Sequence, residues 1–325
     1  MDIVSLGELL VDMFPAELGR RMAEVTAFHP KPGGAPANVA VAAARLGADA
    51  AFIGKVGEDA FGHHLADVLK AQGVETRGVR FDTNTRTTMA FIAKPDENTA
   101  EYVFYRNPGA DIMLRPDELD RSLLQKTRAF HFGSLSLTNE PSRSATIEAA
   151  TIAREAGALI SFDVNYRPSL WNSRDQAVEQ ITAMIPHVNL LKVNEDELAL
   201  LTATEDLNAG SAKLLAQGPE LVVVTLGPGG SYFRVAGAGA PIPPFAVEAV
   251  DAVGCGDAFI ASVLCRLVQD GDWHDQLSPD LLRQHLRYAN AVGALTALTE
   301  GVIPALPTAV QVDRFLDKQR SATSQ

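Results

Sequence analysis

Short apolar runs alternate along the chain with longer segments in which apolar residues recur at helical spacing. The short runs predict buried strands at residues 3–6, 51–53, 129–133, 159–163, 190–193 and 221–225. The longer segments predict helices at residues 37–46, 61–72, 142–155, 174–185, 195–201, 210–217, 256–268 and 281–298. Strands that alternate with helices are typical of a mostly parallel sheet covered on both faces, so we expect a doubly wound α/β fold.

Two segments interrupt this alternation, at residues 12–32 and 79–107. Within the second segment, residues 85–91 and 101–105 predict two antiparallel strands around a turn at residues 95–98. Ligands of doubly wound sheets bind outside the carboxyl ends of the strands. We therefore expect the two segments to form a small β-sheet that lies over this edge as a lid.

The bulk composition limits the partners of the protein. The 325 residues contain no internal repeat, and we expect a single domain over residues 1–325. The net charge of −12 argues against nucleic acid and anionic membranes, which need a basic patch. No apolar run approaches the roughly 20 residues that span a bilayer, and we expect no signal peptide. Cys255 and Cys265 lie too far apart in one predicted helix for a disulfide, which fits a cytoplasmic location.

The segment from Asp251 to Phe259 carries the strongest chemical signal. It reads Asp-Ala-Val-Gly-Cys-Gly-Asp-Ala-Phe and leads directly into a predicted helix. Backbone N–H groups at such a helix start favour a phosphate. A carboxylate at Asp257 would repel a bound phosphate, but it suits a base that accepts the proton of an attacking hydroxyl. The alternative is that Asp257 is an acidic first-turn residue favoured by the helix dipole.

A second glycine-rich segment lies near the N-terminus. Gly33 and Gly34 precede a predicted helix whose first turn contains Asn38. Glycine N–H groups and an Asn side chain can bind sugar hydroxyls, although a glycine turn followed by a capping residue has the same sequence pattern.

Neither common nucleotide motif is present. Val56 follows Gly54-Lys55 where a phosphate-binding loop needs Ser or Thr, and no Gly-x-Gly-x-x-Gly follows the first strand, so a dehydrogenase is disfavoured.

Together the two segments resemble the signature motifs of the ribokinase-like PfkB carbohydrate kinases, and the resemblance extends over nearly the whole chain. It implies a ribokinase-like α/β fold with a β lid, and an enzyme that uses ATP and Mg²⁺. By this resemblance Asp257 is the base, and Gly254, Cys255 and Gly256 form the anion hole. The family usually has Ala where this chain has Cys255, a difference that spares the backbone donors.

Other positions match the family residue by residue. The resemblance implies sugar contacts at Asp12, Gly33, Gly34 and Asn38. It implies residues near the phosphates and Mg²⁺ at Asn194 and Glu197, and a nucleotide loop with an adenine neighbour at Thr225, Gly227, Gly230 and Asn290. It also implies a K⁺ site at Asp251, Val253, Thr296, Thr299, Gly301 and Ala305.

Within the family, residues 33–40, 105–111 and 163–171 are similar to fructokinases. This similarity implies that Arg106 projects from the lid towards the sugar and that Arg167 positions sugar or phosphate. The alternatives are 2-keto-3-deoxygluconate kinase or another sugar kinase and, from another class, a non-catalytic sugar-binding regulator, which has no need of Asp257. We expect ATP-dependent phosphorylation of D-fructose by a homodimer formed through the lid.

Overall fold

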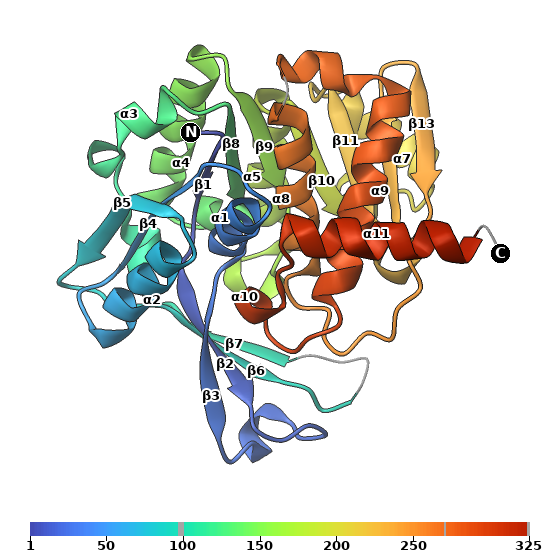
Figure 1. Ribbon diagram of the computed structural model, residues 1–325. Coiled ribbons are helices and arrows are strands. Elements are labelled where there is room, and N and C mark those ends of the chain that lie inside the picture. Colours follow the sequence, from blue (N-terminus) through green and yellow to red (C-terminus); the bar gives the residue numbers. More distant parts are fainter. Residues whose placement is uncertain (97–100, 270, 324–325) are drawn as a thin grey trace.

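The computed structural model describes residues 1–96, 101–269 and 271–323, which form a large sheet flanked by helices and a separate small sheet (Figure 1). The large sheet has the strand order β13-β12-β11-β10-β9-β8-β1-β4-β5. Its strands are β1 (Ile3–Leu6), β4 (Ala50–Gly57), β5 (Glu75–Asp82), β8 (Ala129–Gly133), β9 (Leu159–Asp163), β10 (Leu190–Asn194), β11 (Leu221–Thr225), β12 (Ser231–Val235) and β13 (Ala238–Ile242). The neighbours from β5 to β11 are parallel, and β12 and β13 are antiparallel, which confirms the expected mostly parallel sheet.

Helices cover both faces of this sheet. One face carries α1 (Ala35–Arg45), α2 (Ala60–Ala71), α8 (Cys255–Val268) and α9 (Pro279–Thr296), with α10 (Val302–Ala305) and α11 (Ala309–Thr323) on the same side. The other face carries α3 (Arg121–Leu124), α4 (Ser142–Glu155), α5 (Arg174–Met184), α6 (Glu195–Thr202) and α7 (Leu207–Leu215). Successive strand residues point to opposite faces, so Phe52 joins one hydrophobic core and Ile53 the other. Burial on both sides explains the continuous apolar runs of these strands.

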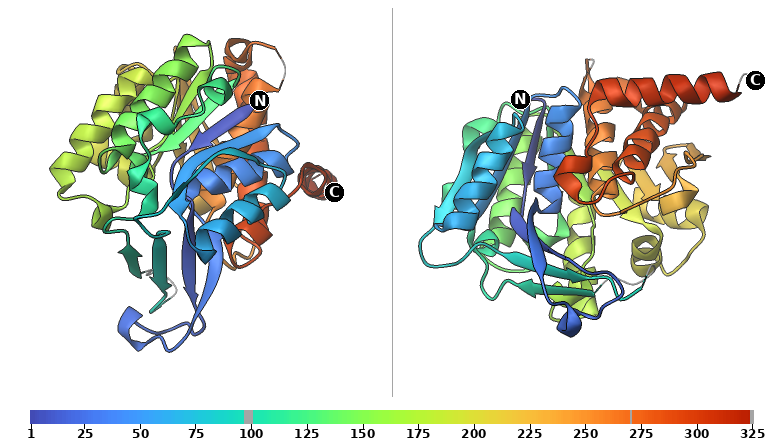
Figure 2. Two further views of the ribbon diagram at one scale, coloured as in Figure 1. Left: turned by 90° about the vertical axis from the view of Figure 1, so that its left-hand side faces the viewer. Right: turned by 60° about the horizontal axis from the view of Figure 1, so that its bottom comes forward.

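The small sheet has the order β3-β2-β6-β7 and lies beyond the carboxyl ends of the parallel strands (Figure 2). Its strands are β2 (Leu10–Pro15), β3 (Phe28–Gly33), β6 (Met89–Ala93) and β7 (Glu101–Tyr105). The chain enters it directly from the carboxyl end of β1, which ends at Leu6. The small sheet therefore faces the edge where ligands of doubly wound folds bind.

The boundaries of the second small-sheet segment differ from our expectation. Residues 79–82 lie in β5 of the large sheet, and the strand expected at residues 85–91 occupies Met89–Ala93. The polar residues between these two strands donate hydrogen bonds to carboxylates and not to a neighbouring strand. The Thr85 N–H donates to Asp82, and the N–H and hydroxyl of Thr87 donate to Asp59. The turn expected at residues 95–98 falls partly outside the described residues.

No helix in the described parts of the chain has both the length and the apolar character needed to cross a membrane. The two cysteines are unpaired, as expected from their positions in α8.

Candidate active site

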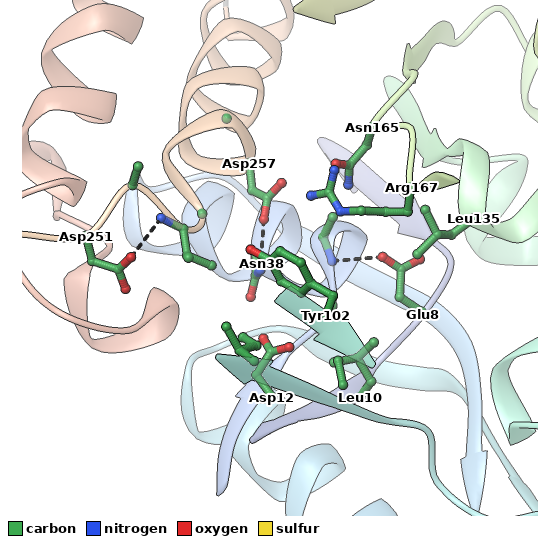
Figure 3. Close-up of a pocket in the computed structure, with 18 of the residues that line it drawn as sticks. Glu8, Leu10, Asp12, Asn38, Tyr102, Leu135, Asn165, Arg167, Asp251 and Asp257 are labelled. Atoms are coloured by element: carbon green, nitrogen blue, oxygen red, sulfur yellow. Dashed lines mark hydrogen bonds between the residues drawn. The ribbon is translucent and has the colours of Figure 1, made fainter. Parts of the chain in front are cut away.

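Two cavities meet at the start of α8, at the carboxyl edge of the large sheet. The first has a volume of about 530 Å³ and lies between the two sheets, where side chains from both converge (Figure 3). Its lining includes Asp12, Asn38, Tyr102, Arg167, Asp251 and Asp257. The second has a volume of about 460 Å³ and lies on the other side of the α8 start, and both cavities are lined in part by Gly256. A small polar ligand and a second ligand can therefore meet at one helix N-terminus.

The turn into α8 requires glycine and leaves backbone donors free. Gly254 has φ 80°, and a Cβ there would lie 2.3 Å from Cγ1 of Val302. The Cys255 N–H donates to the Ala252 carbonyl at 3.3 Å. In the described residues, the N–H groups of Gly256 and Asp257 have no acceptor, as is usual for the first turn of a helix. These two N–H groups are therefore available to an anion, and the N–H of Cys255, which we expected among the donors, is already bonded.

Asp257 connects the two glycine-rich segments. Its Oδ2 accepts a 2.8 Å hydrogen bond from Nδ2 of Asn38, in the first turn of α1, which packs against α8 (Figure 3). Burial raises the pKa of Asp257 to about 6, and the Asn38 bond acts in the opposite direction. The structure thus brings these two predicted residues together and gives Asp257 a pKa suited to a base at neutral pH.

Asp12 faces the same cavity from the small sheet. A Cβ on Gly33, in the neighbouring strand, would lie 1.9 Å from Oδ2 of Asp12, so glycine is needed there for the carboxylate to fit. Gly34, the other glycine of the pair, has φ 108° and caps α1. Burial, with a smaller contribution from the Asp257 carboxylate, raises the pKa of Asp12 to about 7. A carboxyl group opposite Asp257 suits the binding of hydroxyl groups, because its oxygens accept hydrogen bonds.

The two predicted arginines lie in different surroundings. Arg167 lines the first cavity, and its Nη1 donates to the carbonyl of Tyr166. Arg106 is buried and turns into the protein: its Nε donates to Asp111 at 2.7 Å, and its other nitrogens donate to Thr138 Oγ1 and the Leu135 carbonyl. Our expectation that Arg106 projects towards the sugar is therefore wrong. The buried Asp111, five residues along the chain, holds the guanidinium away from the cavity.

The second cavity contains most of the predicted nucleotide residues. Thr225, Gly227, Gly230 and Asn290 line it together with Phe245 and Phe259. The mainly apolar walls suit the flat face of a purine base. The Asn290 side chain donates to the carbonyls of Ile242 and Pro243, so it fixes the loop that forms one wall.

Asn194 and Glu197 line neither cavity. They form a capping box at the start of α6, in which Asn194 Oδ1 accepts from the Glu197 N–H and Glu197 Oε2 accepts from the Asn194 N–H. The other Glu197 oxygen accepts from the N–H of Tyr166 at 2.7 Å. Glu197 thereby supports the loop that presents Arg167, and a contact of these two residues with phosphate or Mg²⁺ stays a prediction.

Three of the residues predicted around K⁺, Asp251, Val253 and Gly301, are joined by hydrogen bonds. The Asp251 carboxylate accepts from the N–H groups of Val253 and Gly301 and pairs with Lys94 at 2.9 Å. These bonds join the loop before α8 to the loop between α9 and α10. The remaining members of the set lie on or beside the second of these loops: Thr296, Thr299 and Ala305. In the described residues, no three His, Cys, Asp or Glu side chains form a metal site, and carbonyl ligation of K⁺ requires none.

Three buried polar residues of the first cavity were not predicted from the sequence. Lys192 lies in β10 and binds Asp163 at the end of β9. Glu8 is 4% exposed, and its Oε1 accepts from the Ala35 N–H at the start of α1. Burial raises the pKa of Glu8 to about 7. A charged residue inside an otherwise apolar strand was the available signal for Lys192, and strand order was needed to identify its partner.

Cys255 lies at the second cavity, where its thiol is not expected to react readily. Burial raises its pKa to about 12, and the carboxylates of Asp251 and Asp257 act in the same direction. We expect Cys255→Ala to retain nearly full kcat, because the backbone donors and Asp257 remain. Steady-state kinetics of the purified variant would test this. Loss of most of the kcat with an intact circular dichroism spectrum would show that the thiol takes part in the reaction.

Comparison with known proteins gives a consistent result. The sequence matches the model of the pfkB family carbohydrate kinases over residues 1–309. Probable fructokinase-4 of Arabidopsis thaliana is 44% identical over 315 residues, 97% of this chain and 96% of the relative. The crystal structure of fructokinase with bound ATP from Xylella fastidiosa has a TM-score of 0.90 at 32% identity, covering 98% of this chain and 99% of that chain. A fructokinase double mutant from Vibrio cholerae O395, in fructose, ADP and potassium ion bound form, has a TM-score of 0.87 at 30% identity, covering 97% and 98%.

Proposed function

Because the chain belongs to the pfkB family of carbohydrate kinases, we propose that it transfers the γ-phosphoryl group of ATP to D-fructose, giving fructose 6-phosphate and ADP. The observation that carries this proposal is the position of Asp257. Its carboxyl group lies at a helix start shared by a polar cavity and a mainly apolar one, with free N–H groups beside it. A buried base next to anion donors is the arrangement that phosphoryl transfer to a hydroxyl needs.

Each substrate would occupy one of the two cavities. Fructose would occupy the 530 Å³ cavity between Asp12 and Asn38, with Arg167 beside it. ATP would place its adenine in the 460 Å³ cavity and its γ-phosphate at the start of α8. Asp257 accepts the proton of the sugar hydroxyl, the hydroxyl oxygen bonds to the γ-phosphorus, and the bond from that phosphorus to ADP breaks. The free N–H groups of Gly256 and Asp257 stabilise the charge on the transferring group.

The donor set fits the two cations that the family resemblance implies. Mg²⁺ keeps much of its hydration in kinases and is held largely by phosphate oxygens, so the absence of a three-carboxylate cluster in the described residues agrees with it. The family resemblance implies Glu197 near this ion, and Glu197 would act on it through the Tyr166 and Asn194 N–H groups, from which its two oxygens accept hydrogen bonds. Mg²⁺ supplies charge neutralisation of the phosphates when bound. K⁺ would lie between the Asp251 and Gly301 loops, coordinated by backbone carbonyls.

The pH dependence of kcat/KM for the sugar should show two acidic groups. Asp257, with a pKa raised to about 6, must be ionised to accept a proton, and Asp12, with a pKa raised to about 7, binds hydroxyls best when ionised. We therefore expect log kcat/KM to fall as the pH drops below about 7, and more steeply below about 6, because kcat/KM reports groups of the free enzyme. Initial rates from about pH 5 to about pH 9 at constant ionic strength would test this. A profile that stays level down to about pH 5 would contradict it.

A panel of sugars with ADP release as the readout would test the substrate. We expect the largest kcat/KM for D-fructose, and a product that co-migrates with fructose 6-phosphate. Preference for 2-keto-3-deoxygluconate would support that alternative within the family. Sugar binding without ADP release from any sugar would support a non-catalytic sugar-binding regulator.

The small sheet also supports the proposed homodimer. Val103 and Tyr105 on β7 are 42% and 67% exposed, and the rings of Phe28, Phe91 and Tyr105 contact one another in series. A partly exposed patch of apolar and aromatic side chains on a sheet suits contact with a second copy of the same sheet. A cytoplasmic location also stays a proposal, supported by the unpaired cysteines.

A further inference from the structure

Two lysines are buried in the large sheet, and they differ in how their ammonium groups are bonded. Lys55 lies in β4 and Lys192 in β10, and they are 3% and 6% exposed. An ammonium group has three N–H donors, and burial makes each unbonded donor costly. The number of hydrogen-bond acceptors around each lysine therefore indicates whether its ammonium group has a structural role or can bind a ligand.

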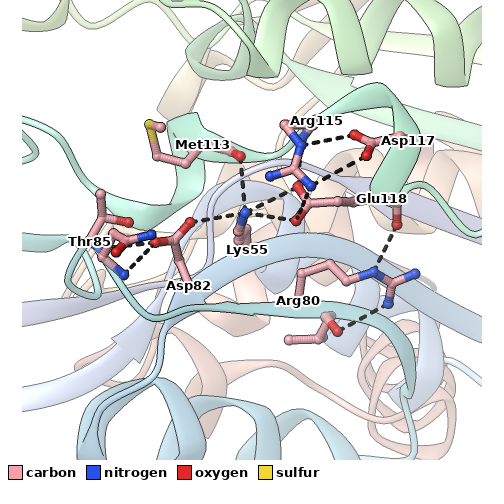
Figure 4. Close-up of polar contacts among 10 residues, drawn as sticks. Lys55, Arg80, Asp82, Thr85, Met113, Arg115, Asp117 and Glu118 are labelled. Atoms are coloured by element: carbon pink, nitrogen blue, oxygen red, sulfur yellow. Dashed lines mark hydrogen bonds and ion pairs between the residues drawn. The ribbon is translucent and has the colours of Figure 1, made fainter.

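Lys55 is fully bonded by the protein (Figure 4). Its Nζ pairs with Asp82 at 2.9 Å and donates to Glu118 at 2.8 Å and to the Met113 carbonyl at 3.2 Å. Two carboxylates and a carbonyl account for all three donors. Lys55 lines neither of the two active-site cavities, so its role is to join β4, β5 and the segment around Glu118.

Lys192 has fewer partners. Its Nζ binds both oxygens of Asp163, at 2.9 and 2.8 Å, and among the described residues no third acceptor lies within hydrogen-bonding distance. Both residues line the first cavity together with Asp257. One N–H donor of Lys192 is thus left for a ligand.

The spare donor lies beside the start of α8. A Cβ on Gly256 would be 3.3 Å from Nζ of Lys192. Because Gly256 has no side chain, the ammonium group lies close to the backbone at the helix start. The free N–H groups of Gly256 and Asp257 lie in the same first turn of α8. The two free N–H groups, which carry the positive end of the helix dipole, therefore lie beside the full positive charge of Lys192.

Lys192 keeps its charge despite its burial. Burial acts to lower its pKa, but the carboxylates of Asp163, Glu197 and Asp257 outweigh it, and the pKa of Lys192 is raised. The cation in turn acts to lower the pKa of Asp257. Lys192 is therefore protonated at neutral pH, where Asp257 is mostly ionised.

We propose that Lys192 is a catalytic cation whose third N–H binds the transferring phosphoryl group, and that Asp163 is the residue that positions it. The inference rests on the proposed kinase function. In the step described above, Asp257 takes the hydroxyl proton while the oxygen–phosphorus bond forms and the bond to ADP breaks. Lys192 keeps its own proton throughout and stabilises the negative charge on the phosphoryl oxygens as it moves from ADP to the sugar.

The direct test replaces the charge and keeps the length of the side chain. We expect Lys192→Met to lower kcat by about a hundredfold or more, the usual effect of losing one donor to a developing charge, with the KM for the sugar changed by less than about threefold. The matched control is Lys55→Met, which also breaks a buried lysine pair. It should lower the melting temperature but leave the kcat of the folded enzyme near that of the wild type.

Chemical rescue separates catalysis from structural support. Lys192→Ala leaves a space beside Asp163, and added propylammonium should restore part of the lost kcat, whereas tetramethylammonium, which has no N–H donor, should not. The acidic limb of the kcat/KM profile should also move to higher pH in Lys192→Met, because Asp257 loses a neighbouring cation.

Several outcomes would overturn this inference. A folded Lys192→Met with a kcat within about threefold of the wild type would show that the ammonium does not act on the phosphoryl group. Failure of both Lys192 variants to fold at a temperature where Lys55→Met folds would make Lys192 a structural residue. A wild-type protein that phosphorylates no sugar would instead refute the proposed function, and wild-type activity on another sugar would move the same test to that sugar.

Discussion

Asp257→Asn should lower kcat by at least about a hundredfold while sugar and ATP still bind. An amide at this position can still accept the hydrogen bond from Asn38 Nδ2, so the contact between α1 and α8 is kept. It cannot accept a proton from a sugar hydroxyl, which is the step assigned to the carboxylate. Initial-rate kinetics with saturating substrates, together with direct measurement of sugar binding, would separate these two effects.

The same substitution should not destabilise the protein. The folded-state pKa of Asp257 is about 6, compared with a reference value of 3.8, so the cost of its ionisation to folding builds up between these two pH values and is complete at neutral pH. A shift of that size corresponds to roughly 3 kcal/mol, which Asn removes at neutral pH. The melting temperature of Asp257→Asn at about pH 7.5 should therefore equal or exceed that of the wild type. A variant that retains a third of the wild-type kcat would remove Asp257 from the mechanism.

Most of the large sheet could be predicted because its parallel strands are buried on both faces. Such strands appear as uninterrupted apolar runs, for example Leu221–Thr225, and they are easy to recognise. The antiparallel strands Ser231–Val235 and Ala238–Ile242 were not predicted. The second contains Gly239 and Pro241, which weaken the sequence signal for a strand and are tolerated at the edge of a sheet.

The candidate site shows the same division between local and long-range information. The sequence indicates Asp257 and Asn38, because glycine-rich helix starts are local features, and the structure places their side chains 2.8 Å apart. The direction of Arg106 could not be predicted, since it depends on Asp111 and on the buried Thr138 thirty-two residues away. A sequence motif predicts which residue lies near the site. The direction of its side chain depends on the surrounding packing.

The pairing of Lys192 with Asp163 is the clearest case of information that the sequence does not carry directly. The two residues lie 29 positions apart and meet because β9 and β10 are neighbours in parallel register, with Lys192 opposite Asp163. A lysine in a buried strand predicts a partner, since an unpaired buried charge is strongly unfavourable. The identity of that partner, and the position of Gly256 beside it, required the strand order and the placement of α8.

Asp12→Ala should raise the KM for the sugar by roughly tenfold to a hundredfold and change the KM for ATP by less than about threefold, because a charge-assisted hydrogen bond contributes about 1.5–3 kcal/mol. Asp12 belongs to the small sheet and lines only the first of the two cavities, so we expect it to contact the sugar and not ATP. Asp12→Asn is the matched control, since it keeps the size and one acceptor oxygen and should fall between the wild type and the alanine variant. It should also remove the step near pH 7 from the kcat/KM profile, because burial raises the pKa of Asp12 to about 7. Equal weakening of both substrates, or of neither, would show that Asp12 does not bind the sugar hydroxyls.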